Sequence, residues 1–192
     1  MHHFAPAMKA FVHKTAEVSK QAKIGDGTFI WNEAKVREGA EIGRLCRIGK
    51  SVYVDKNVII GDGCKIQNFA TIYDGVVIGS QVFIGPHVCF TNDIRPRAAS
   101  TDWRILHTKV DDGASIGANA TIVCGVRIGK YAMVGAGAVV TKDVPRNGLV
   151  VGNPAVIIGY VCSKGHDLDK SHYCRVCDEK VRVPHTRKKK SG

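Results

Sequence analysis

The sequence predicts an all-β solenoid, in which short strands wind into a stack of parallel coils. Three observations predict this fold. Valine or isoleucine returns at every sixth residue, glycine often follows it directly, and a small or β-branched residue stands in the fifth place of each six-residue unit. A fixed short repeat decides the architecture of a chain, so it takes precedence over local propensities.

The aliphatic series runs in two registers, which are separated by an interruption after Phe90. The first register contains Val12, Val18, Ile24, Ile30, Val36, Ile42, Ile48, Val54, Ile60, Ile66, Ile72, Ile78 and Ile84. The second register contains Val110, Ile116, Ile122, Ile128, Val134 and Val140. The repeat therefore extends over most of the chain, and one long segment interrupts it.

A period of six fits neither a helix, whose apolar residues stand three and four apart, nor a simple alternating strand. It fits short strands joined by tight corners, each strand directing one aliphatic residue inward. Stacked coils then pair backbone to backbone around a continuous aliphatic column. Glycine in the second place, as at Gly25 and Gly43, is expected to relax the backbone at the corners. Small residues in the fifth place, as at Ala34, let the neighbouring wall approach closely.

The interruption at residues 91–109 is a single long loop in an otherwise regular repeat. Loops of this length in compact domains are mostly functional or disordered. This one contains Trp103, which it has to bury, so we expect an ordered loop. Its arginines Arg95, Arg97 and Arg104 suit phosphate or carboxylate groups. We therefore expect the loop to take part in function; the alternative is that it only seals a seam between subunits.

Composition limits the classes of protein and partner. With 192 residues the chain has room for one main domain and an appendage. It has no apolar run long enough to span a membrane, and its start at Met1 lacks the layout of a signal peptide. We expect a cytoplasmic protein. The net charge of +11 favours an anionic small molecule as partner, because the repeat lacks the basic and aromatic pattern that grips bases.

The chain has seven cysteines, an odd count. Cys46 and Cys64 take the small fifth place of their units, so we expect them to be buried thiols. Cys89 and Cys124 fall in other places and are expected to be more exposed. Reduced interior cysteines suit the cytoplasm better than a secreted protein.

The remaining cysteines lie in the tail, residues 159–192, together with a basic end at Arg187–Lys190. Cys174 and Cys177 form a two-residue knuckle, and Cys162 with His166 would complete a tetrahedral zinc site. His172 is a competing ligand. A segment too small to bury a core gains stability from such a metal, and free thiols on a loose tail are the alternative. The tail resembles the zinc-ribbon tails of some hexapeptide transferases, although Gly165 stands where their second cysteine is expected.

The repeat, from residue 12 to about 158, resembles the hexapeptide-repeat acyltransferases. This resemblance implies a left-handed parallel β-helix of triangular coils, close to seven in number, preceded by a lead-in at residues 1–11. The left hand is implied by the family alone, because parallel crossovers are usually right-handed. An ordered set of motifs narrows the resemblance to acetyltransferases that act on the 3-amino group of nucleotide-linked sugars. The motifs are Lys65-Ile66-Gln67-Asn68, Tyr73-Asp74, Phe90-Thr91-Asn92, Pro96-Arg97, Gly117-Ala118-Asn119, Gly135-Ala136-Gly137-Ala138 and Gly152-Asn153-Pro154-Ala155.

This resemblance implies acetyl-CoA as co-substrate, a UDP or dTDP amino sugar as acceptor, a homotrimer with sites at the subunit seams, and a role in surface-glycan synthesis. It implies that Asn92 positions the sugar amine, with His87 as a reserve base, while His107 is expected to have no function. Tyr73, at a coil corner beside Asp74, is expected to stack on the sugar or base, or alternatively to plug a subunit seam. Lys65, Gln67 and Asn68 are expected nearby as hydrogen-bond partners of the nucleotide sugar, although solvation alone would also explain Gln67 and Asn68. Arg97 is expected to hold a diphosphate or a carboxylate. Cofactor contacts are implied for Gly117, Ala118, Arg127, Lys130, Gly135, Ala136, Ala138 and Lys142, and packing at coil corners is the alternative for the small residues among them.

Three other interpretations remain open at this point. Acetyltransferases acting on other small molecules share the repeat, although Asn92 and Arg97 argue against them. The γ-class carbonic anhydrases need three histidines on a metal, and only His87 and His107 lie in the later coils. A solenoid that binds nucleic acid through the tail is the third.

Overall fold

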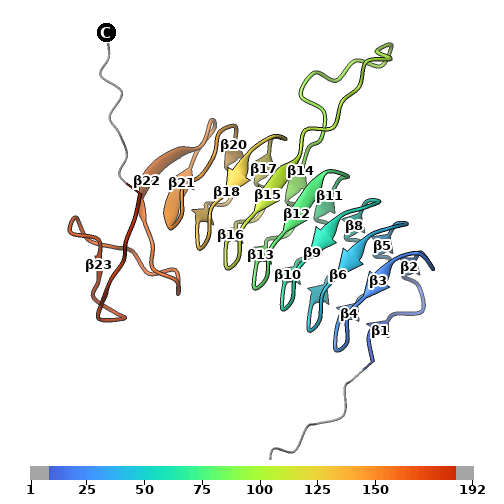
Figure 1. The fold of residues 1–192 in the computed structure, drawn as a ribbon, viewed down its shortest axis with the longest axis horizontal. Coiled ribbons are helices and arrows are strands. Elements are labelled where there is room, and N and C mark those ends of the chain that lie inside the picture. Colours follow the sequence, from blue (N-terminus) through green and yellow to red (C-terminus); the bar gives the residue numbers. More distant parts are fainter. Residues whose placement is uncertain (1–8, 185–192) are drawn as a thin grey trace, which may run out of the picture.

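The computed structural model describes residues 9–184, so that residues 1–8 and the basic run Arg187–Lys190 lie outside the described residues. The described residues form a stack of coils with three strands per coil, a long loop and a small tail at the C-terminal end of the stack (Figure 1). No helix among them is long and apolar enough to cross a membrane.

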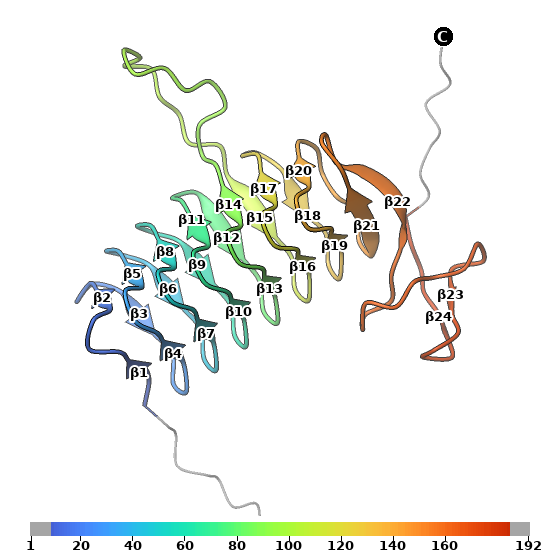
Figure 2. The ribbon, with the colours of Figure 1, turned by 180° about the vertical axis from the view of Figure 1, so that it is seen from behind.

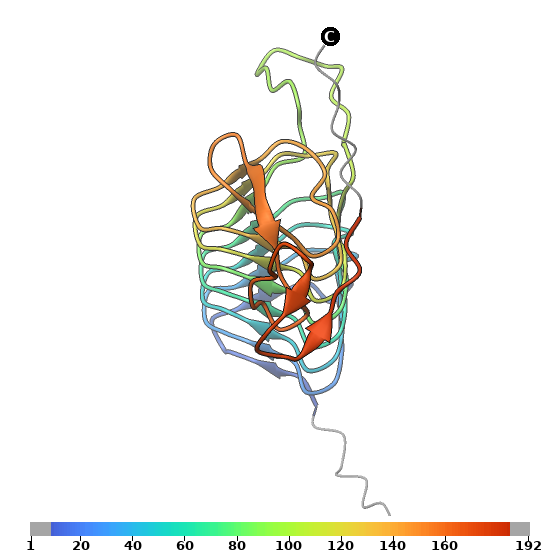
Figure 3. The ribbon, with the colours of Figure 1, turned by 90° about the vertical axis from the view of Figure 1, so that its left-hand side faces the viewer.

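Three parallel sheets form the walls of the stack, and Figure 3 shows the coils nearly superimposed when viewed from its end. Wall A contains β1 (Phe11–Val12), β4 (Phe29–Ile30), β7 (Arg47–Ile48), β10 (Lys65–Ile66), β13 (Phe83–Ile84), β16 (Ser115–Ile116), β19 (Met133–Val134) and β21 (Gly148–Val151). Wall B contains β2 (Glu17–Val18), β5 (Lys35–Val36), β8 (Tyr53–Val54), β11 (Thr71–Ile72), β14 (Cys89–Phe90), β17 (Thr121–Ile122) and β20 (Val139–Val140). Wall C contains β3 (Lys23–Ile24), β6 (Glu41–Ile42), β9 (Ile59–Ile60), β12 (Val76–Ile78), β15 (Thr108–Val110) and β18 (Arg127–Ile128).

Each strand pairs with the strand one coil away. In the regular part of the stack residues 18 apart thus become neighbours, as with Ile48 and Ile66 in wall A, and across the inserted loop the separation is 32, as with Ile84 and Ile116. The aliphatic series from Ile30 to Val140 is buried and forms the interior column. Burying one such side chain stabilises the fold by about 1.5–3 kcal/mol. At the open N-terminal end Val12 remains 42% exposed. The predicted fold class, an all-β left-handed parallel β-helix of hexapeptide repeats with one inserted loop, is confirmed.

Glycines in the second place of the units do not relax the backbone at the corners, as was predicted, but have a different role. The residues with positive φ occupy the fourth place of the units, where glycine alternates with residues such as Leu45 (φ 59°) and Phe69 (φ 63°). The second-place glycines are needed for close approach instead. A Cβ on Gly25 would lie 2.5 Å from the carbonyl carbon of Gly43 in the next coil. The prediction that second-place glycines relax the corners was therefore wrong.

The cysteines of the stack follow the prediction at three of their four positions. Cys46 and Cys64 are completely buried, and Cys89 is half-buried. Cys124 is buried, contrary to expectation, because it lies at the corner after β17, against the start of the long loop. Its backbone N–H donates to Thr91 Oγ1 at 3.0 Å.

The C-terminal end of the stack departs from the parallel pattern. Strand β22 (Val156–Tyr160) turns back and pairs antiparallel with β21. The tail follows, with a short antiparallel hairpin of β23 (Tyr173–Cys174) and β24 (Glu179–Lys180). Asn147, buried in the last corner, donates from Nδ2 to the carbonyl of Val161 at 2.8 Å. The tail is thus joined to the end of the stack.

Candidate functional site

The long loop leaves the stack at the edge between walls B and C and returns to the same edge (Figure 2). We call this the B–C edge; it carries the corners at residues 37–40, 55–58, 73–75 and 123–126, and the loop itself, residues 91–107. The hydroxyls of Thr91 and Thr108 accept the backbone N–H groups of Cys124 (3.0 Å) and Gly125 (3.1 Å). Both ends of the loop are thereby fastened to the coil above.

Between these anchors the loop projects away from the stack, and two of its apolar residues remain about half exposed. Ile94 is 53% exposed and Trp103 is 49% exposed. Within this chain Trp103 is thus only half-buried, because the loop extends outward instead of folding back over a wall. Arg95, Arg97 and Arg104 are all exposed along it.

Asn92 lies at the base of the loop, where the two ends of the loop meet. Its Nδ2 donates to the backbone carbonyl of Asp74 at 3.4 Å, and its own carbonyl accepts the N–H of Leu106 at 3.3 Å. A carbonyl oxygen only accepts hydrogen bonds, so the amide nitrogen of Asn92 must be the atom facing Asp74. The side-chain oxygen is left to accept a hydrogen bond from a ligand.

Asp74 and Tyr73 form the corner beneath Asn92. Asp74 is 8% exposed, and its carboxylate lies 3.8 Å from Lys56 Nζ. Tyr73 is exposed and meets the ring of Tyr53 edge-on, with 5.8 Å between the ring centroids. An exposed aromatic ring and a carboxylate thus lie in the corner whose backbone Asn92 contacts.

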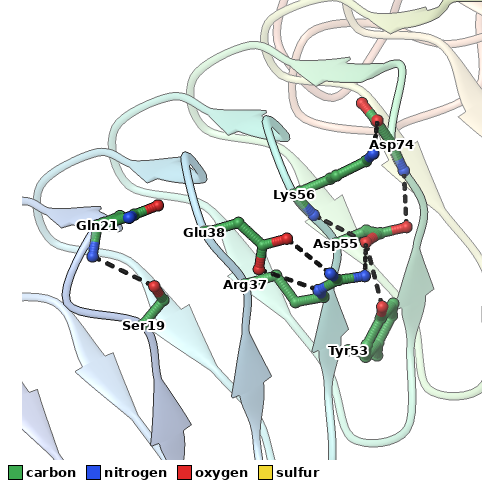
Figure 4. Close-up of polar contacts among 8 residues, drawn as sticks. All are labelled: Ser19, Gln21, Arg37, Glu38, Tyr53, Asp55, Lys56 and Asp74. Carbon is green, nitrogen blue, oxygen red and sulfur yellow. Dashed lines mark hydrogen bonds and ion pairs between the residues drawn. The ribbon is translucent and has the colours of Figure 1, made fainter.

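A buried carboxylate, Asp55, organises the corner one coil earlier (Figure 4). Its oxygens accept hydrogen bonds from the Tyr53 hydroxyl at 3.1 Å, from the Lys56 backbone N–H at 2.8 Å and from the Asp74 backbone N–H at 3.3 Å. Arg37 Nη1 lies 3.1 Å from the same carboxylate. A buried charge with several partners holds its surroundings in one arrangement.

The charges at this edge shift one another's pKa values. The pKa of Arg37 is raised by the nearby Tyr53 hydroxyl and, next, by its hydrogen bond to Glu38. The pKa of Glu38 is lowered by a backbone hydrogen bond and by the Arg37 guanidinium. Both groups therefore remain charged at neutral pH.

Sequence reasoning did not identify this support from Arg37, Asp55 and Lys56. The sequence contained a sign of it, because Glu38, Lys56, Asp74 and Asn92 follow one another at intervals of 18 residues, which is one coil. Residues at this spacing stack along one edge, and here they place charged and polar groups in a continuous row.

The other predicted residues lie elsewhere on the chain. Lys65, Gln67 and Asn68, which were expected near Tyr73, lie instead on wall A or at its edge with wall B, and His87 lies at that same edge. His87 precedes β14 in the corner between walls A and B, and Asn92 follows β14 at the B–C edge. They lie at opposite ends of this strand and do not meet within one chain.

We call the edge between walls A and B the A–B edge. Asn68 and His87 make structural contacts there. Asn68 Oδ1 accepts the Lys50 backbone N–H at 2.9 Å. The His87 ring stacks on Phe69 at 4.9 Å, with 12° between the ring planes. His87 itself has a positive φ of 59°.

The residues expected to contact the cofactor lie in three places. These are the late corners between walls A and B, a groove along wall C, and the position of Lys142 after β20. Gly117, Ala118, Gly135, Ala136 and Ala138 belong to the late corners of the A–B edge. Ala138 is completely buried, so its side chain packs inside the coil. A Cβ on Gly117 would lie 2.5 Å from the Ala136 nitrogen, so packing of adjacent coils already requires this glycine. Lys142 is exposed after β20.

Arg127 and Lys130 line a groove of ≈ 580 Å³ that follows the late part of wall C. The Arg127 guanidinium contacts the Asp111 carboxylate at 2.8 Å, and Lys130 Nζ lies 3.7 Å from the Asp112 carboxylate. Each cation thus already has an acidic partner, and the groove carries both signs of charge.

In the tail, Cys162, His166, Cys174 and Cys177 come together, with their ligand atoms within 4.8 Å of one another. This is the one group among residues 9–184 whose geometry suits a metal ion. His172 is not a member; its ring packs edge-on to Tyr160 with 5.5 Å between centroids.

Comparison with known families finds the repeat itself. The profile described as "Bacterial transferase hexapeptide (six repeats)" matches residues 21–56, 57–92 and 107–142. A second profile, "Hexapeptide repeat of succinyl-transferase", matches residues 39–74. The gap between residues 92 and 107 in the first match falls on the inserted loop. A search of curated proteins found no match.

Two solved structures with TM-scores above 0.5 have the same fold, and a third is less similar. The acetyltransferase domain of PglB from Neisseria gonorrhoeae FA1090, in complex with acetyl coenzyme A, is 22% identical with a TM-score of 0.56, over 79% of this chain and 58% of that chain. UDP-N-acetylglucosamine acyltransferase from Campylobacter jejuni is 19% identical with a TM-score of 0.57, over 81% of this chain and 74% of that chain. PerB from Caulobacter crescentus, in complex with CoA and GDP-perosamine, is 24% identical with a TM-score of 0.47, over 80% of this chain and 58% of that chain. This chain thus spans less than two thirds of the PerB and PglB chains.

Proposed function

The chain belongs to the bacterial transferase hexapeptide family, and on that premise we propose that it is an acetyl-CoA-dependent N-acetyltransferase. Its acceptor in this proposal is the 3-amino group of a UDP- or dTDP-linked amino sugar. The observation that carries the proposal is the position of Asn92, held at the base of a long loop and directed by its bond to Asp74. The acetyl-CoA complex of the PglB domain supports the choice of donor.

The reaction is the attack of a neutral sugar amine on the acetyl thioester. The amine nitrogen forms a bond to the carbonyl carbon, the bond from carbon to sulfur breaks, and the amine proton leaves with the CoA thiolate. Such a reaction gains most from holding the two groups in line. Asn92 Oδ1 accepts one N–H of the amine and thereby directs the nitrogen lone pair at the thioester. An amide cannot take up the proton, so its role is to position the amine.

The rest of the B–C edge suits a sugar linked to a nucleotide. Tyr73 offers an exposed ring on which a sugar or a base can stack. Asp74 offers a carboxylate to sugar hydroxyls, and Lys56 balances its charge. Arg97 on the loop suits the diphosphate or the carboxylate of a uronate, since its planar fork binds both in a bidentate manner. The product would serve the assembly of surface glycans.

A trimer explains why the expected residues lie on two edges of one chain. A heterologous contact, repeated three times, closes into a ring and sets one edge of each subunit against a different edge of the next. The B–C edge of one subunit, with its exposed loop, would then face Gln67, Asn68 and His87 of the next. The pantetheine arm would follow the late corners of that second edge, near Gly117 and Gly135. The half-exposed Trp103 would be covered by the neighbouring subunit.

The direct test is the release of CoA thiol from acetyl-CoA with a panel of nucleotide sugars. The panel contains UDP and dTDP sugars with an amine at carbon 3 or at carbon 4, each beside its hydroxyl counterpart. We expect release only with a 3-amino sugar. Release with a 4-amino sugar alone would support an N-acetyltransferase activity but refute the 3-amino group as the acceptor. Silence across the panel, while acetyl-CoA still binds, would refute the nucleotide-sugar acceptor and favour another small molecule.

A further inference from the structure

We propose that Cys162, His166, Cys174 and Cys177 bind one zinc ion, and that this ion fastens the tail to the C-terminal end of the stack. The four residues come from two separated segments. Cys162 and His166 follow β22, while Cys174 and Cys177 belong to the hairpin of β23 and β24. A single ion would therefore join these two segments.

The distances between the ligand atoms fit a tetrahedron around zinc. Bonds of about 2.3 Å to sulfur and about 2.05 Å to nitrogen place two sulfurs about 3.8 Å apart and a sulfur and a nitrogen about 3.6 Å apart. The Sγ atoms of Cys162 and Cys177 are 3.8 Å apart. His166 Nδ1 lies 3.6 Å from Cys162 Sγ, 3.3 Å from Cys177 Sγ and 3.9 Å from Cys174 Sγ.

Backbone amides around the cluster favour negatively charged sulfurs. Cys162 Sγ accepts the N–H groups of Lys164 at 3.3 Å and His166 at 3.4 Å. Cys174 Sγ accepts the N–H of Cys177 at 3.4 Å. Hydrogen bonds of this kind orient metal ligands and stabilise thiolates. The His166 contacts all run through Nδ1, so Nδ1 is the nitrogen that binds the metal.

A disulfide and simple packing both fit the cluster less well than a metal ion does. A disulfide needs sulfurs about 2.05 Å apart, and the Cys162 and Cys177 sulfurs are 3.8 Å apart. Simple packing does not account for a histidine ring nitrogen surrounded by three sulfurs. Four protein ligands fill a tetrahedral shell and leave no open position, which is the pattern of structural zinc.

The position of the cluster indicates what the ion does. Strand β22 covers the exposed edge of β21, and the tail that follows it is bonded to Asn147 in the last corner. Open sheet edges invite pairing with other chains, and solenoids need a cap on their terminal coil. The tail buries few apolar side chains of its own, so the ion replaces a core in holding its hairpin against the stack.

The first test is the metal content of the full-length protein, purified without chelator and measured by mass spectrometry. We expect close to one zinc per chain. The metal-stripped protein titrated with Co²⁺ should develop the visible absorption of tetrahedral cobalt bound to thiolates, saturating at one equivalent. Less than about one ion per five chains, together with no such absorption on titration, would overturn the proposal. This titration needs no variant, so a variant that fails to fold does not obscure the answer.

Matched variants assign the ligands. Cys177→Ser and His166→Ala should each lower the stoichiometry, whereas Cys89→Ser, a half-buried thiol outside the cluster, and His172→Ala should retain one zinc. Loss of zinc in His172→Ala with retention in His166→Ala would overturn this ligand set. Hydrogen exchange then tests the fastening: chelation should expose amides of residues 162–180 while those of β7 to β16 stay protected. Equal exposure of both regions would refute a role confined to the tail.

Discussion

Gly75 places the long loop against the B–C edge, and its replacement by alanine tests that placement. Gly75 has a φ of +92°, a conformation that side chains other than glycine rarely adopt. A Cβ at this position would overlap Cγ2 of Ile105 and lie 3.6 Å from Nδ1 of His107. Ile105 and His107 form the returning end of the loop, next to Thr108. Gly75→Ala should therefore displace the loop from the edge.

The cost has two parts that a control separates. A positive φ costs a side chain roughly 1–2 kcal/mol, and forcing a methyl into an occupied space costs about 1–3 kcal/mol more. Gly152 has a similar φ of +96°, but a Cβ there meets only the Pro154 carbonyl oxygen, at an ordinary 3.6 Å. We expect Gly152→Ala to lose about 1–2 kcal/mol of unfolding free energy and Gly75→Ala to lose about 2–5 kcal/mol.

Urea unfolding followed by circular dichroism measures both variants, and CoA release measures function. Because a displacement of about 1 Å can cost about a hundredfold in rate, Gly75→Ala should lose at least about tenfold in turnover while Gly152→Ala stays within about twofold. Equal losses of stability and turnover in the two variants would refute the idea that Gly75 seats the loop through Ile105.

Three further tests concern the core, the site and the surface charges. Phe90→Ala removes a completely buried ring and should cost about 3–5 kcal/mol in urea unfolding. Phe83 lies on the preceding strand β13 of wall A and is 38% exposed, so Phe83→Ala should cost far less, and the reverse order would contradict the assigned interior. In the CoA-release assay Asn92→Ala should lower turnover more than tenfold with no change in oligomeric state, whereas His87→Ala should cost little; a loss near a thousandfold in His87→Ala would reinstate histidine as the base. The pKa of Asp62 is lowered first by the backbone N–H of Arg44 and then by the Arg44 guanidinium. The charged Asp62 therefore stabilises the fold above about pH 4, and this stabilisation is lost as the pH falls through the lowered pKa. Asp62→Asn should therefore be less stable than the parent at neutral pH and equal to it in acid, and a difference that persists in acid thermal melts would contradict this sign.

The period of six by itself determined the stack of coils. One aliphatic residue per unit, as at Ile48, Ile66 and Ile84, has to face inward whatever lies around it, so the interior column follows from local spacing alone. The interruption after Phe90 and the cysteine spacing in the tail were also legible, because they depend on positions close together in the chain. The contacts of Cys162, His166 and the Cys174–Cys177 knuckle then agreed with the predicted ligand set.

The tertiary structure decided everything that depends on neighbouring coils and on the three edges. Only the stacking of units 18 residues apart shows that Lys56 and Asp74 support Asn92 while His87 lies across a wall. It also shows that Gly25 is needed because the next coil approaches it, and that Cys124 is buried against the start of the loop. A repeat of six specifies which side of each strand faces inward, but three such units make a coil, and the assignment of a side chain to one edge exists only once the coils have closed and stacked.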